Sequence, residues 1–182
     1  MEAIANFSKV SYEQFYEDHV KHRIECYHDA SATGENHDKY HSIVKPLYGN
    51  LPLPKRATTG SAGYDFVTPS TVTVNPGDTV TIPTGIRVKI DEGWVLMIFP
   101  RSSLGFKYNT RLVNTVGIID SDYYNADNEG HIMIKIINNS DSSFTLNKYD
   151  RFAQGIFLPY GITVDDSATG KRSGGMGSTG QN

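Results

Sequence analysis

Short runs in which apolar and polar residues alternate fill much of the chain after residue 70. They read TVTV at 71–74, TVTI at 79–82, IRVKI at 86–90, WVLMIF at 94–99 and HIMIKII at 131–137. Side chains of a strand point alternately to its two faces, so a period of two is typical of strands with one buried face. No helix-period segment of useful length interrupts the runs. They constrain the chain to an all-β fold class.

Turn-forming residues separate several of these runs. NPGD lies between the first two runs and DEG between the third and fourth, and glycine beside Asn, Asp or Pro is typical of hairpin loops. We therefore expect hairpins at both places. Many short strands at regular spacing favour a β-sandwich or jelly roll over an α/β nucleotide-binding fold. The 182 residues suffice for one such domain with a short extension.

Residues 11–27, SYEQFYEDHVKHRIECY, have the period of an amphipathic helix instead. One face of this predicted helix carries Tyr16, Val20, Ile24 and Tyr27. Ser11 and Gln14 have the spacing of a capping box, in which the two side chains satisfy backbone N–H groups of the first turn. We expect a single helix here.

Residues 28–50 are polar and contain His28, His37 and His41 at irregular spacing. Metal binding is one interpretation, but the spacing matches no known ligand pattern, and a solvated loop is the prediction. We divide the chain accordingly into an N-terminal helical extension and loop, residues 1–50, and a β domain, residues 51–182.

Composition argues against several classes of function. The net charge of -3 and the isoelectric point near 6.0 argue against a general binder of nucleic acids or membrane surfaces, which carries excess Lys and Arg. Cys26 is the only cysteine, so neither an intrachain disulfide nor a cysteine zinc cluster can form. The N-terminus lacks a basic region followed by a long apolar run. We expect a cytoplasmic protein with no nucleic-acid or membrane partner.

The C-terminal stretch KRSGGMGSTGQN, residues 171–182, places two cations beside several glycines. Glycine lets consecutive backbone N–H groups converge on an anion, and Lys171 or Arg172 would supply charge. The alternative is a disordered Gly/Ser tail, which composition alone favours. A phosphate loop of the kinase or GTPase type is excluded, because Asp165 stands where its first glycine should be and Arg172 follows the lysine.

Five stretches carry residues typical of a nucleotide site. They are AGYDF at 62–66, PRSSLGFK at 100–107, NTVGIIDSDYYN at 114–125, DRFAQGIF at 150–157 and RSGGMGSTG at 172–180. In order and spacing they resemble the five motifs of the trimeric dUTPases, enzymes of bacterial or phage type that split dUTP into dUMP and pyrophosphate. The resemblance covers residues 51–182 and implies a jelly-roll subunit of a homotrimer, with each active site built from all three chains.

The resemblance gives Asp120 the catalytic role. It matches the family's carboxylate, which orients and deprotonates a water for in-line attack on the α-phosphorus. The alternative is that Asp120 and Asp122 are only turn residues at the tip of a β-hairpin. The motif match favours the catalytic role for Asp120.

The same predicted hairpin is expected to bind the nucleoside, because an exposed strand edge offers N–H and C=O groups that imitate a pairing base. The matching uracil-recognition positions are Asn114, Gly117, Ile118 and Ile119. Tyr123 matches the aromatic residue that packs under the deoxyribose and leaves no room for a 2′-hydroxyl. Read simply from its place in the sequence, it could also be an ordinary strand aromatic.

The third motif runs on as DYYNADNEGHIMI, which is longer than the family's common pattern. We expect the extra polar residues, about 124–130, to form a solvent-exposed bulge or loop. Beyond the inserted residues, Met133 aligns with a further substrate-binding residue of the family. Gly130 aligns with the glycine of the family's third motif.

The remaining motifs match phosphate contacts. The corresponding residues are Arg101, Ser102, Ser103, Gln154, Arg172, Gly177 and Ser178. Asp65 and Arg151 match residues that hold this part of the site together, and a buried mutual ion pair is an equally good interpretation. The resemblance also implies Mg²⁺, held by the triphosphate and water with no protein ligand.

One position in the tail departs from the family. Met176 stands where phenylalanine usually stacks on uracil. Methionine covers a ring by dispersion but has no flat π-face, so weaker base stacking is expected.

Two other functions stay open at this stage. A deaminase of dCTP would have a similar fold, but it expects a glutamate base in the hairpin region and lacks a tail of the GSTG kind. A regulatory binding protein could use the nucleotide site as a switch, with the N-terminal helix or the insertion contacting a protein partner.

Overall fold

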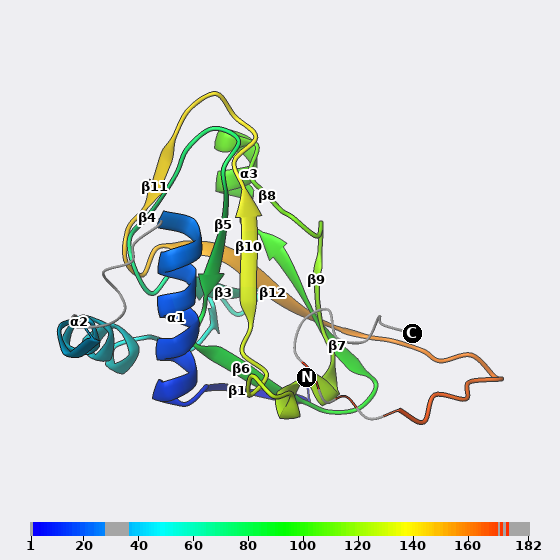
Figure 1. The fold of residues 1–182 in the computed structure, drawn as a ribbon. Coiled ribbons are helices and arrows are strands. Elements are labelled where there is room, and N and C mark those ends of the chain that lie inside the picture. Colours follow the sequence, from blue (N-terminus) through cyan, green and yellow to red (C-terminus); the bar gives the residue numbers. More distant parts are fainter. Residues whose placement is uncertain (1, 28–36, 171, 173, 175–182) are drawn as a thin grey trace.

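The computed structural model describes residues 2–27 and 37–170, together with Arg172 and Gly174. The chain forms a body made mostly of strands, and the two helices of the N-terminal region pack along one side of it (Figure 1). This confirms the all-β prediction with a helical extension. Within the described ranges, no helix is both long enough and apolar enough to cross a bilayer.

The strands are β1 (Ala5–Lys9), β2 (Lys55–Arg56), β3 (Tyr64–Val67), β4 (Val72–Val74), β5 (Thr79–Pro83), β6 (Ile86–Ile90), β7 (Trp94–Pro100), β8 (Arg111–Leu112), β9 (Gly117–Ile119), β10 (Met133–Ile137), β11 (Phe144–Leu146) and β12 (Arg151–Pro159). The helices are α1 (Tyr12–Tyr27), α2 (His37–Gly49), α3 (Ser102–Tyr108) and the 3₁₀ helix η3 (Ser121–Asn125). All five predicted runs are strands. Helix α3 was not predicted, because seven residues are too few to establish a helical period.

The strands pair antiparallel in four hydrogen-bonded groups. The largest has the order β2-β3-β12-β7-β9, and a second has the order β5-β10-β8. Two further pairs are β1-β6 and β11-β4. Strand β9 lies at the edge of the largest group, where it pairs with β7.

The predicted hairpins at NPGD and DEG are wrong. The turns themselves are present, since Gly77 and Gly93 have φ angles of 80° and 83° that favour glycine. The flanking strands, however, pair elsewhere: β4 with β11, β5 with β10, β6 with β1, and β7 with β12 and β9. The two turns therefore carry the chain from one sheet to another.

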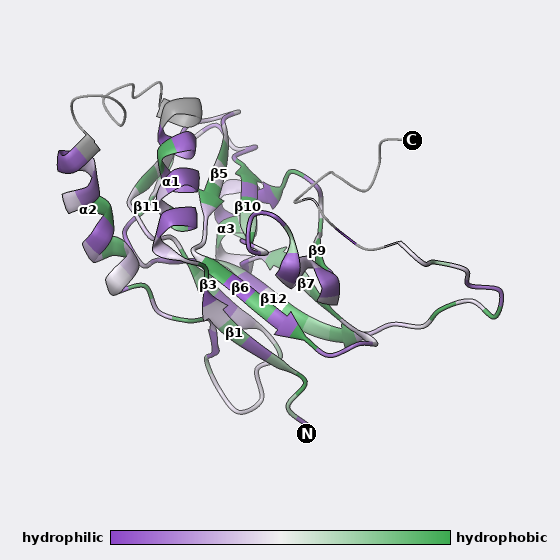
Figure 2. Cartoon of the chain, turned by 60° about the horizontal axis from the view of Figure 1, so that its bottom comes forward, coloured by the Kyte–Doolittle hydropathy of each residue, from purple (hydrophilic) through white to green (hydrophobic). Residues whose placement is uncertain are grey.

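The alternating pattern buries one set of side chains between the sheets. Along β6 the apolar residues Ile86, Val88 and Ile90 are buried, whereas Lys89 between them is exposed. Figure 2 shows this alternation of hydrophobic and hydrophilic residues along the strands. The same core contains the fully buried Phe66 and Phe152, so it spans the whole strand body.

The N-terminal residues join this body through a strand that the sequence did not predict. β1 pairs with β6 from Ala5↔Ile90 to Lys9↔Ile86, and the N–H of Val10 then donates to the carbonyl of Gly85 at 3.1 Å. The first residues of the extension are thus part of the sheet structure.

Helix α1 forms where it was predicted, with half of the expected capping box. The N–H of Gln14 donates to Oγ of Ser11 at 3.1 Å, but the Gln14 side chain donates to Asp18 instead of reaching back. The buried face is also rotated from the predicted one. Tyr16 is buried and Val20 half-buried, and the other fully buried side chains are Phe15, His19 and His22. Burial of Ile24 and Tyr27 lies outside what the structure describes.

The loop prediction is wrong for residues 37–49, which form α2. Tyr40 and Val44 are buried in a small cluster with Phe15 and Tyr16 of α1. The ring of His41 stacks on Tyr16 with centroids 3.7 Å apart. Packing against α1 therefore stabilises a helix whose own sequence is polar and contains a proline. Residues 28–36, with His28, lie outside the described ranges.

The two buried histidines predict that acid weakens the packing of α1. Burial, together with Arg23 and, for His19, with His22, lowers the pKa of both His19 and His22 to about 4. Between pH 6.5 and about 4 the unfolded chain binds protons that the folded chain does not, so the free energy of unfolding falls as the pH falls.

We expect a loss of about 1–2 kcal/mol per histidine between about pH 7 and pH 5. Thermal unfolding of wild type and of the double variant His19→Gln/His22→Gln at both pH values measures this. Glutamine does not titrate, so the variant should lose clearly less stability than wild type. Equal losses of stability in wild type and variant would contradict the assignment of this pH dependence to His19 and His22.

Candidate active site

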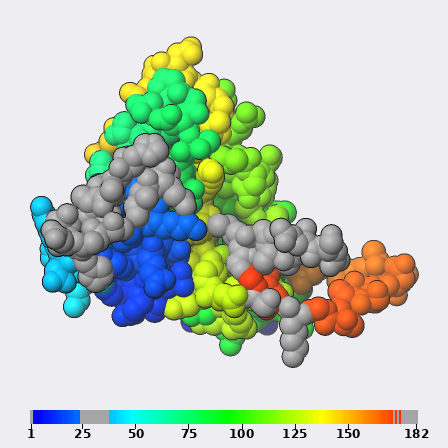
Figure 3. Space-filling view, in the orientation of Figure 1, coloured from blue at the N-terminus to red at the C-terminus, as the bar shows by residue number. Residues whose placement is uncertain are grey.

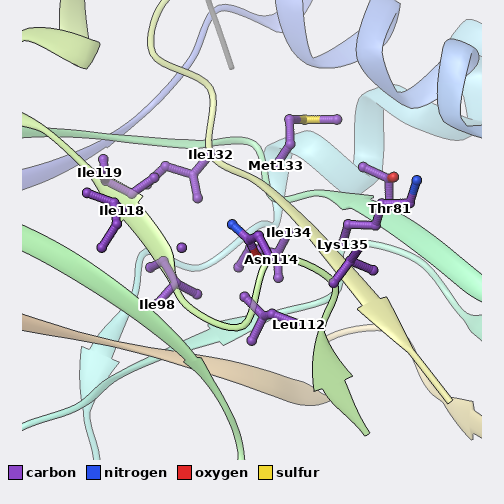
Figure 4. A pocket seen from close by; sticks show the side chains of 12 residues that line it. Thr81, Ile98, Leu112, Asn114, Ile118, Ile119, Ile132, Met133, Ile134 and Lys135 are labelled. Carbon is purple, nitrogen blue, oxygen red and sulfur yellow. The ribbon is translucent and has the colours of Figure 1, made fainter. Parts of the chain in front are cut away.

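Four of the residues predicted to recognise uracil, together with Met133, line one apolar pocket between β9 and β10 (Figure 4). The pocket has a volume of about 250 Å³. Its lining consists of Asn114, Gly117, Ile118, Ile119 and Met133 with Thr81, Ile98, Leu112, Val113, Ile132, Ile134 and Lys135. A flat apolar ring fits such a pocket, and polar groups at its rim could read the edge of that ring.

Strand β9 supplies the wall of this apolar pocket, and its free edge is an observed feature of the sheet. Ile118 points outward and is 49 % exposed, while Ile119 is buried. Gly117 lies so close to β7 that a Cβ there would stand 3.1 Å from Cβ of Ile98. The glycine therefore allows β9 to approach β7 and leaves the pocket open.

Asp120 follows β9 directly and is the N-cap residue of η3. The prediction of a β-hairpin tip is wrong here, because β9 pairs with β7 while β10 pairs with β5 and β8. The Asp120 side chain is 47 % exposed and that of Asp122 57 % exposed. Both line a wide cleft, the carboxylate cleft, with residues of the segment after β12 and with Ile118.

Arg172 forms ion pairs with both carboxylates. Its Nη2 lies 2.8 Å from Oδ2 of Asp120, and its Nε lies 3.2 Å from Oδ1 of Asp122. The predicted phosphate-binding arginine thus lies beside the predicted catalytic carboxylate within one chain. The other tail residues predicted to bind substrate, Met176, Gly177 and Ser178, lie outside the described residues.

Tyr123 is buried beneath this pair of charges, with 2 % of its surface exposed. Its hydroxyl donates to the carbonyl of His131 at 2.7 Å and accepts from Nδ2 of Asn128 at 2.8 Å. Burial raises the pKa of Tyr123, although Asn128 and Arg172 act in the opposite direction. The Arg172 guanidinium lies 5.3 Å from the ring centroid. The ring is therefore fixed at its hydroxyl end and has a cation over its face.

Four of the predicted phosphate contacts, together with Asp65, line a separate polar hollow at the other end of β7. Its volume is about 390 Å³, and its lining includes Asp65, Arg101, Ser102, Ser103 and Gln154. Ser102 and Ser103 are exposed in the first turn of α3. The hollow presents hydroxyl and guanidinium donors suited to an anion.

Asp65 holds two arginines at this hollow. It lies 3.1 Å from Nη1 of Arg151 and 3.3 Å from Nε of Arg101. The Asp65 side chain is 14 % exposed but that of Arg151 is 49 % exposed, so the predicted ion pair is present and only half-buried. Nε2 of Gln154 donates to the carbonyl of Pro100 at 3.4 Å.

The polar hollow and the carboxylate cleft are far apart in one chain. Asp120 follows Ile119, which pairs with Leu96 near the start of β7. Arg101, in contrast, follows the last residue of β7. About six strand residues separate the two positions, which corresponds to roughly 20 Å. Figure 1 shows α3 and the stretch after β9 at opposite ends of β7. The two sets of residues cannot meet at one phosphorus atom within a single chain.

The insertion at 124–130 is only partly exposed to solvent, which corrects the prediction of a solvent-exposed loop; Asn125 and Asp127 are exposed as expected. Ala126 and Gly130 are buried, and the Arg87 guanidinium lies 3.6 Å from the ring centroid of Tyr124. Arg87 also donates to the Tyr124 carbonyl. No local signal in the sequence points to these contacts, since Arg87 occupies an ordinary half-buried position of β6.

The family model described as dUTPase matches residues 49–180 of this chain. The chain belongs to the dUTPase family. A dUTPase of Lactococcus lactis is 40% identical over 141 residues, which cover 76% of this chain and 94% of that protein. Residues 1–48 precede the matched family region.

Solved structures of dUTPases share the fold. The enzyme from Streptococcus mutans is 41% identical, with a TM-score of 0.57 over 64% of this chain and 91% of that one. A point mutant of the dUTPase from phage phi11 of Staphylococcus aureus, described with a structural Mg(II) ion, is 23% identical, with a TM-score of 0.55 over 66% of this chain and 92% of that one. The predicted jelly-roll fold is thereby confirmed.

The contact of Gly117 with Ile98 predicts that a side chain at residue 117 closes the apolar pocket. Gly117→Val should weaken binding of a non-hydrolysable dUTP analogue at least about tenfold, because the added carbons fill the pocket or push β9 from β7. Calorimetric titration measures the Kd. Gly49→Val is the matched control, since nothing lies within 4 Å of a Cβ at that position. An unchanged Kd for Gly117→Val would show that the pocket does not hold the nucleotide.

Proposed function

We propose that this dUTPase-family chain hydrolyses dUTP to dUMP and pyrophosphate, with Asp120 as the residue that activates the attacking water. One observation carries the proposal: Ile118 lines both the apolar pocket and the carboxylate cleft. A nucleotide with its base in the pocket would therefore extend its sugar and α-phosphate toward Asp120.

The base would be read by the free edge of β9. Backbone N–H and C=O groups in fixed positions can pair with the edge of uracil, and Asn114 lies at the rim of the same pocket. Cytosine presents an amine where uracil presents a carbonyl, so a fixed donor there would leave two donors facing each other. Such a mismatch at a buried polar site gives strong discrimination.

The sugar would lie against Tyr123. The hydroxyl of this residue is held by His131 and Asn128, so the ring has little freedom to move away. A rigid ring beneath the deoxyribose would leave no space for the 2′-hydroxyl of a ribonucleotide. This makes Tyr123 the residue that discriminates dUTP from UTP.

Hydrolysis would proceed by in-line attack. Asp120 accepts a proton from a water, whose oxygen forms a bond to the α-phosphorus while the bond from that phosphorus to the bridging oxygen breaks. Pyrophosphate leaves with that oxygen, and dUMP remains. Removing dUTP limits uracil in DNA and supplies dUMP for dTMP synthesis.

Nη2 of Arg172 lies 2.8 Å from Oδ2 of Asp120. A triphosphate carries several negative charges and competes for the guanidinium. Binding of dUTP would draw Arg172 to the phosphates, as the γ-phosphate contact, and leave the Asp120 carboxylate free to accept the proton. Gly177 and Ser178 would add backbone and hydroxyl donors to the same phosphates.

Mg²⁺ is the proposed cofactor. A hard divalent ion bound to the triphosphate neutralises charge on its oxygens and gathers them. Asp120 and Asp122 present half-exposed carboxylates to the cleft, which fits an ion held by phosphate and water rather than by a protein cage.

We propose a homotrimer with sites shared between chains, and the separation of the two sets of residues along β7 supports this sharing. The polar hollow of one chain can supply phosphate contacts next to the carboxylate cleft of another chain only if the chains associate. The segment after β12 also suits exchange with a partner, since it extends from the body (Figure 1) with Tyr160, Ile162 and Val164 exposed by 50, 75 and 109 %.

A regulatory role is the second candidate, carried by the N-terminal helices that lie outside the family match. They could contact a protein partner while the site binds nucleotide. The deaminase alternative is not favoured, because the matched family and relatives are dUTPases. A cytoplasmic location agrees with the deoxynucleotide substrate.

Asp120→Asn should bind dUTP and hydrolyse it at least about a hundredfold more slowly, a barrier increase of about 2.7 kcal/mol or more. The amide cannot take the proton from water. Initial rates of pyrophosphate release across all common dNTPs measure activity and specificity. Asp127→Asn is the control, because Asp127 is exposed on the insertion. Near-normal turnover of Asp120→Asn would sink the catalytic assignment.

Sharing of sites can be tested with two inactive variants, Asp120→Ala and a truncation that ends at Gly170. If the tail of one chain closes over the Asp120 of a neighbour, each mixed trimer regains one complete site. Random co-refolding leaves about three-quarters of trimers mixed, so about a quarter of all sites should recover.

The competing arrangement is the contact seen within one chain, where Arg172 meets its own Asp120. In that case every site in a mixed trimer lacks one component. Absence of activity after verified co-assembly would therefore reject the exchanged tail.

A further inference from the structure

Helix α1 contacts the segment that carries the proposed active-site residues. We propose that Asp18 of α1, acting through His131, is a positioning residue that holds Tyr123 in place for discrimination between dUTP and UTP. The proposal rests on the proposed function, because Tyr123 is taken there to contact the sugar. Figure 3 shows α1 in blue beside the yellow-green stretch around residues 120–130 on the same face.

The first link is a hydrogen bond between Asp18 and His131. Oδ2 of Asp18 lies 2.6 Å from Nδ1 of His131, which is fully buried. The other ring nitrogen, Nε2, accepts from the N–H of Gly85 at 2.7 Å and therefore carries no proton. The proton must be on Nδ1, where it is donated to Asp18. This pair of bonds fixes both the tautomer and the orientation of the imidazole.

The second link runs from His131 to Tyr123. The carbonyl of His131 accepts from the Tyr123 hydroxyl, and the N–H of His131 donates to the carbonyl of Asn128 at 3.0 Å. Asn128 in turn donates through Nδ2 to the same hydroxyl. Fixing the imidazole thus fixes the His131 carbonyl and the Asn128 side chain, the two groups to which the Tyr123 hydroxyl is hydrogen-bonded.

A parallel connection runs through Glu129. Oε2 of Glu129 accepts from the N–H of Ser11, the residue before α1, at 2.7 Å and lies 3.8 Å from Nη1 of Arg87. Arg87 also contacts Tyr124. The start of α1 and its second turn are therefore both bonded to the segment 124–131.

These contacts join the N-terminal extension to the segment that the sequence analysis predicts as an insertion in the third motif. Residues 1–48 precede the family match, whereas residues 124–130 lie within it. Had the extension only covered the core, its contacts would be apolar. Instead it directs a carboxylate and a backbone N–H to the segment between Asp120 and β10.

The test compares Asp18→Ala with Glu17→Ala, the matched control on the exposed side of the same helix. Two quantities are measured: the ratio of kcat/KM for dUTP to that for UTP, and amide hydrogen exchange. For Asp18→Ala we expect the ratio to fall at least about tenfold. We also expect exchange at residues 123, 126, 129 and 131, whose N–H groups are hydrogen-bonded within this segment, to accelerate at least about tenfold.

A merely structural role gives a different result. Loss of general stability would accelerate exchange in β12 as well and would lower turnover of dUTP and UTP together, so an unchanged ratio overturns the proposal. Tyr123→Phe, which keeps the ring but removes the tethered hydroxyl, should lower the ratio in the same direction as Asp18→Ala.

If Asp18→Ala does not fold, Asp18→Asn and Asp18→Leu decide by the same two measurements. The amide oxygen of the Asp18→Asn variant can still accept from Nδ1 of His131, so values of both quantities close to wild type are expected. Asp18→Leu, which fills similar space without an acceptor for that N–H, should change both quantities in the direction given for Asp18→Ala, and wild-type values of both in Asp18→Leu would overturn the proposal. Failure of wild type to hydrolyse dUTP would instead reject the proposed function, while the exchange data would still report on the positioning contact.

Discussion

Hydrogen bonding of β7 on both sides is the constraint on which the site depends. β7 pairs with β12 from Ala153↔Pro100 to Pro159↔Trp94, and with β9 from Leu96↔Ile119 to Ile98↔Gly117. Hydrogen bonding to neighbouring strands holds β7 extended, so groups at its two ends stay separated by the strand's rise per residue. Asp120 and Asp122 lie near one end of β7, and the serines of α3 lie with Arg101 at the other. The proposed function therefore requires that one site takes residues from more than one chain.

Much of the strand content was predictable, because an alternating pattern is local. The pattern does not specify pairing partners, which is why the turns at Gly77 and Gly93 were assigned to hairpins and proved to connect different sheets. Helix α2 was missed because its residues are polar on average. The spacing of Tyr40, Val44 and Tyr48 could have revealed it, since the first two are buried against α1 and the third packs against that cluster.

The residues around the candidate site also divide into those whose positions the sequence could predict and those whose positions it could not. Asn114, Gly117 and Asp120 lie in one motif, so their adjacency at β9 was predictable from the resemblance. His131 and Asp18 are 113 positions apart, and neither lies in a motif that points to the other. A contact of that kind depends on how α1 packs on the sheet, which no local pattern reports.

The contacts of α1 with the insertion bear on how the stability of the extension depends on that of the insertion. Removing the extension alone would leave Nδ1 of His131 without its acceptor and Glu129 without the backbone N–H that donates to it. Removing the insertion alone would leave the N–H of Ser11 without its acceptor. The bond between Ser11 and Glu129 is lost whole only when both segments are removed, because removal of one leaves the other's polar group without its partner. It therefore links the stability of the extension to that of the insertion, and loss of one segment is expected to weaken the packing of the other.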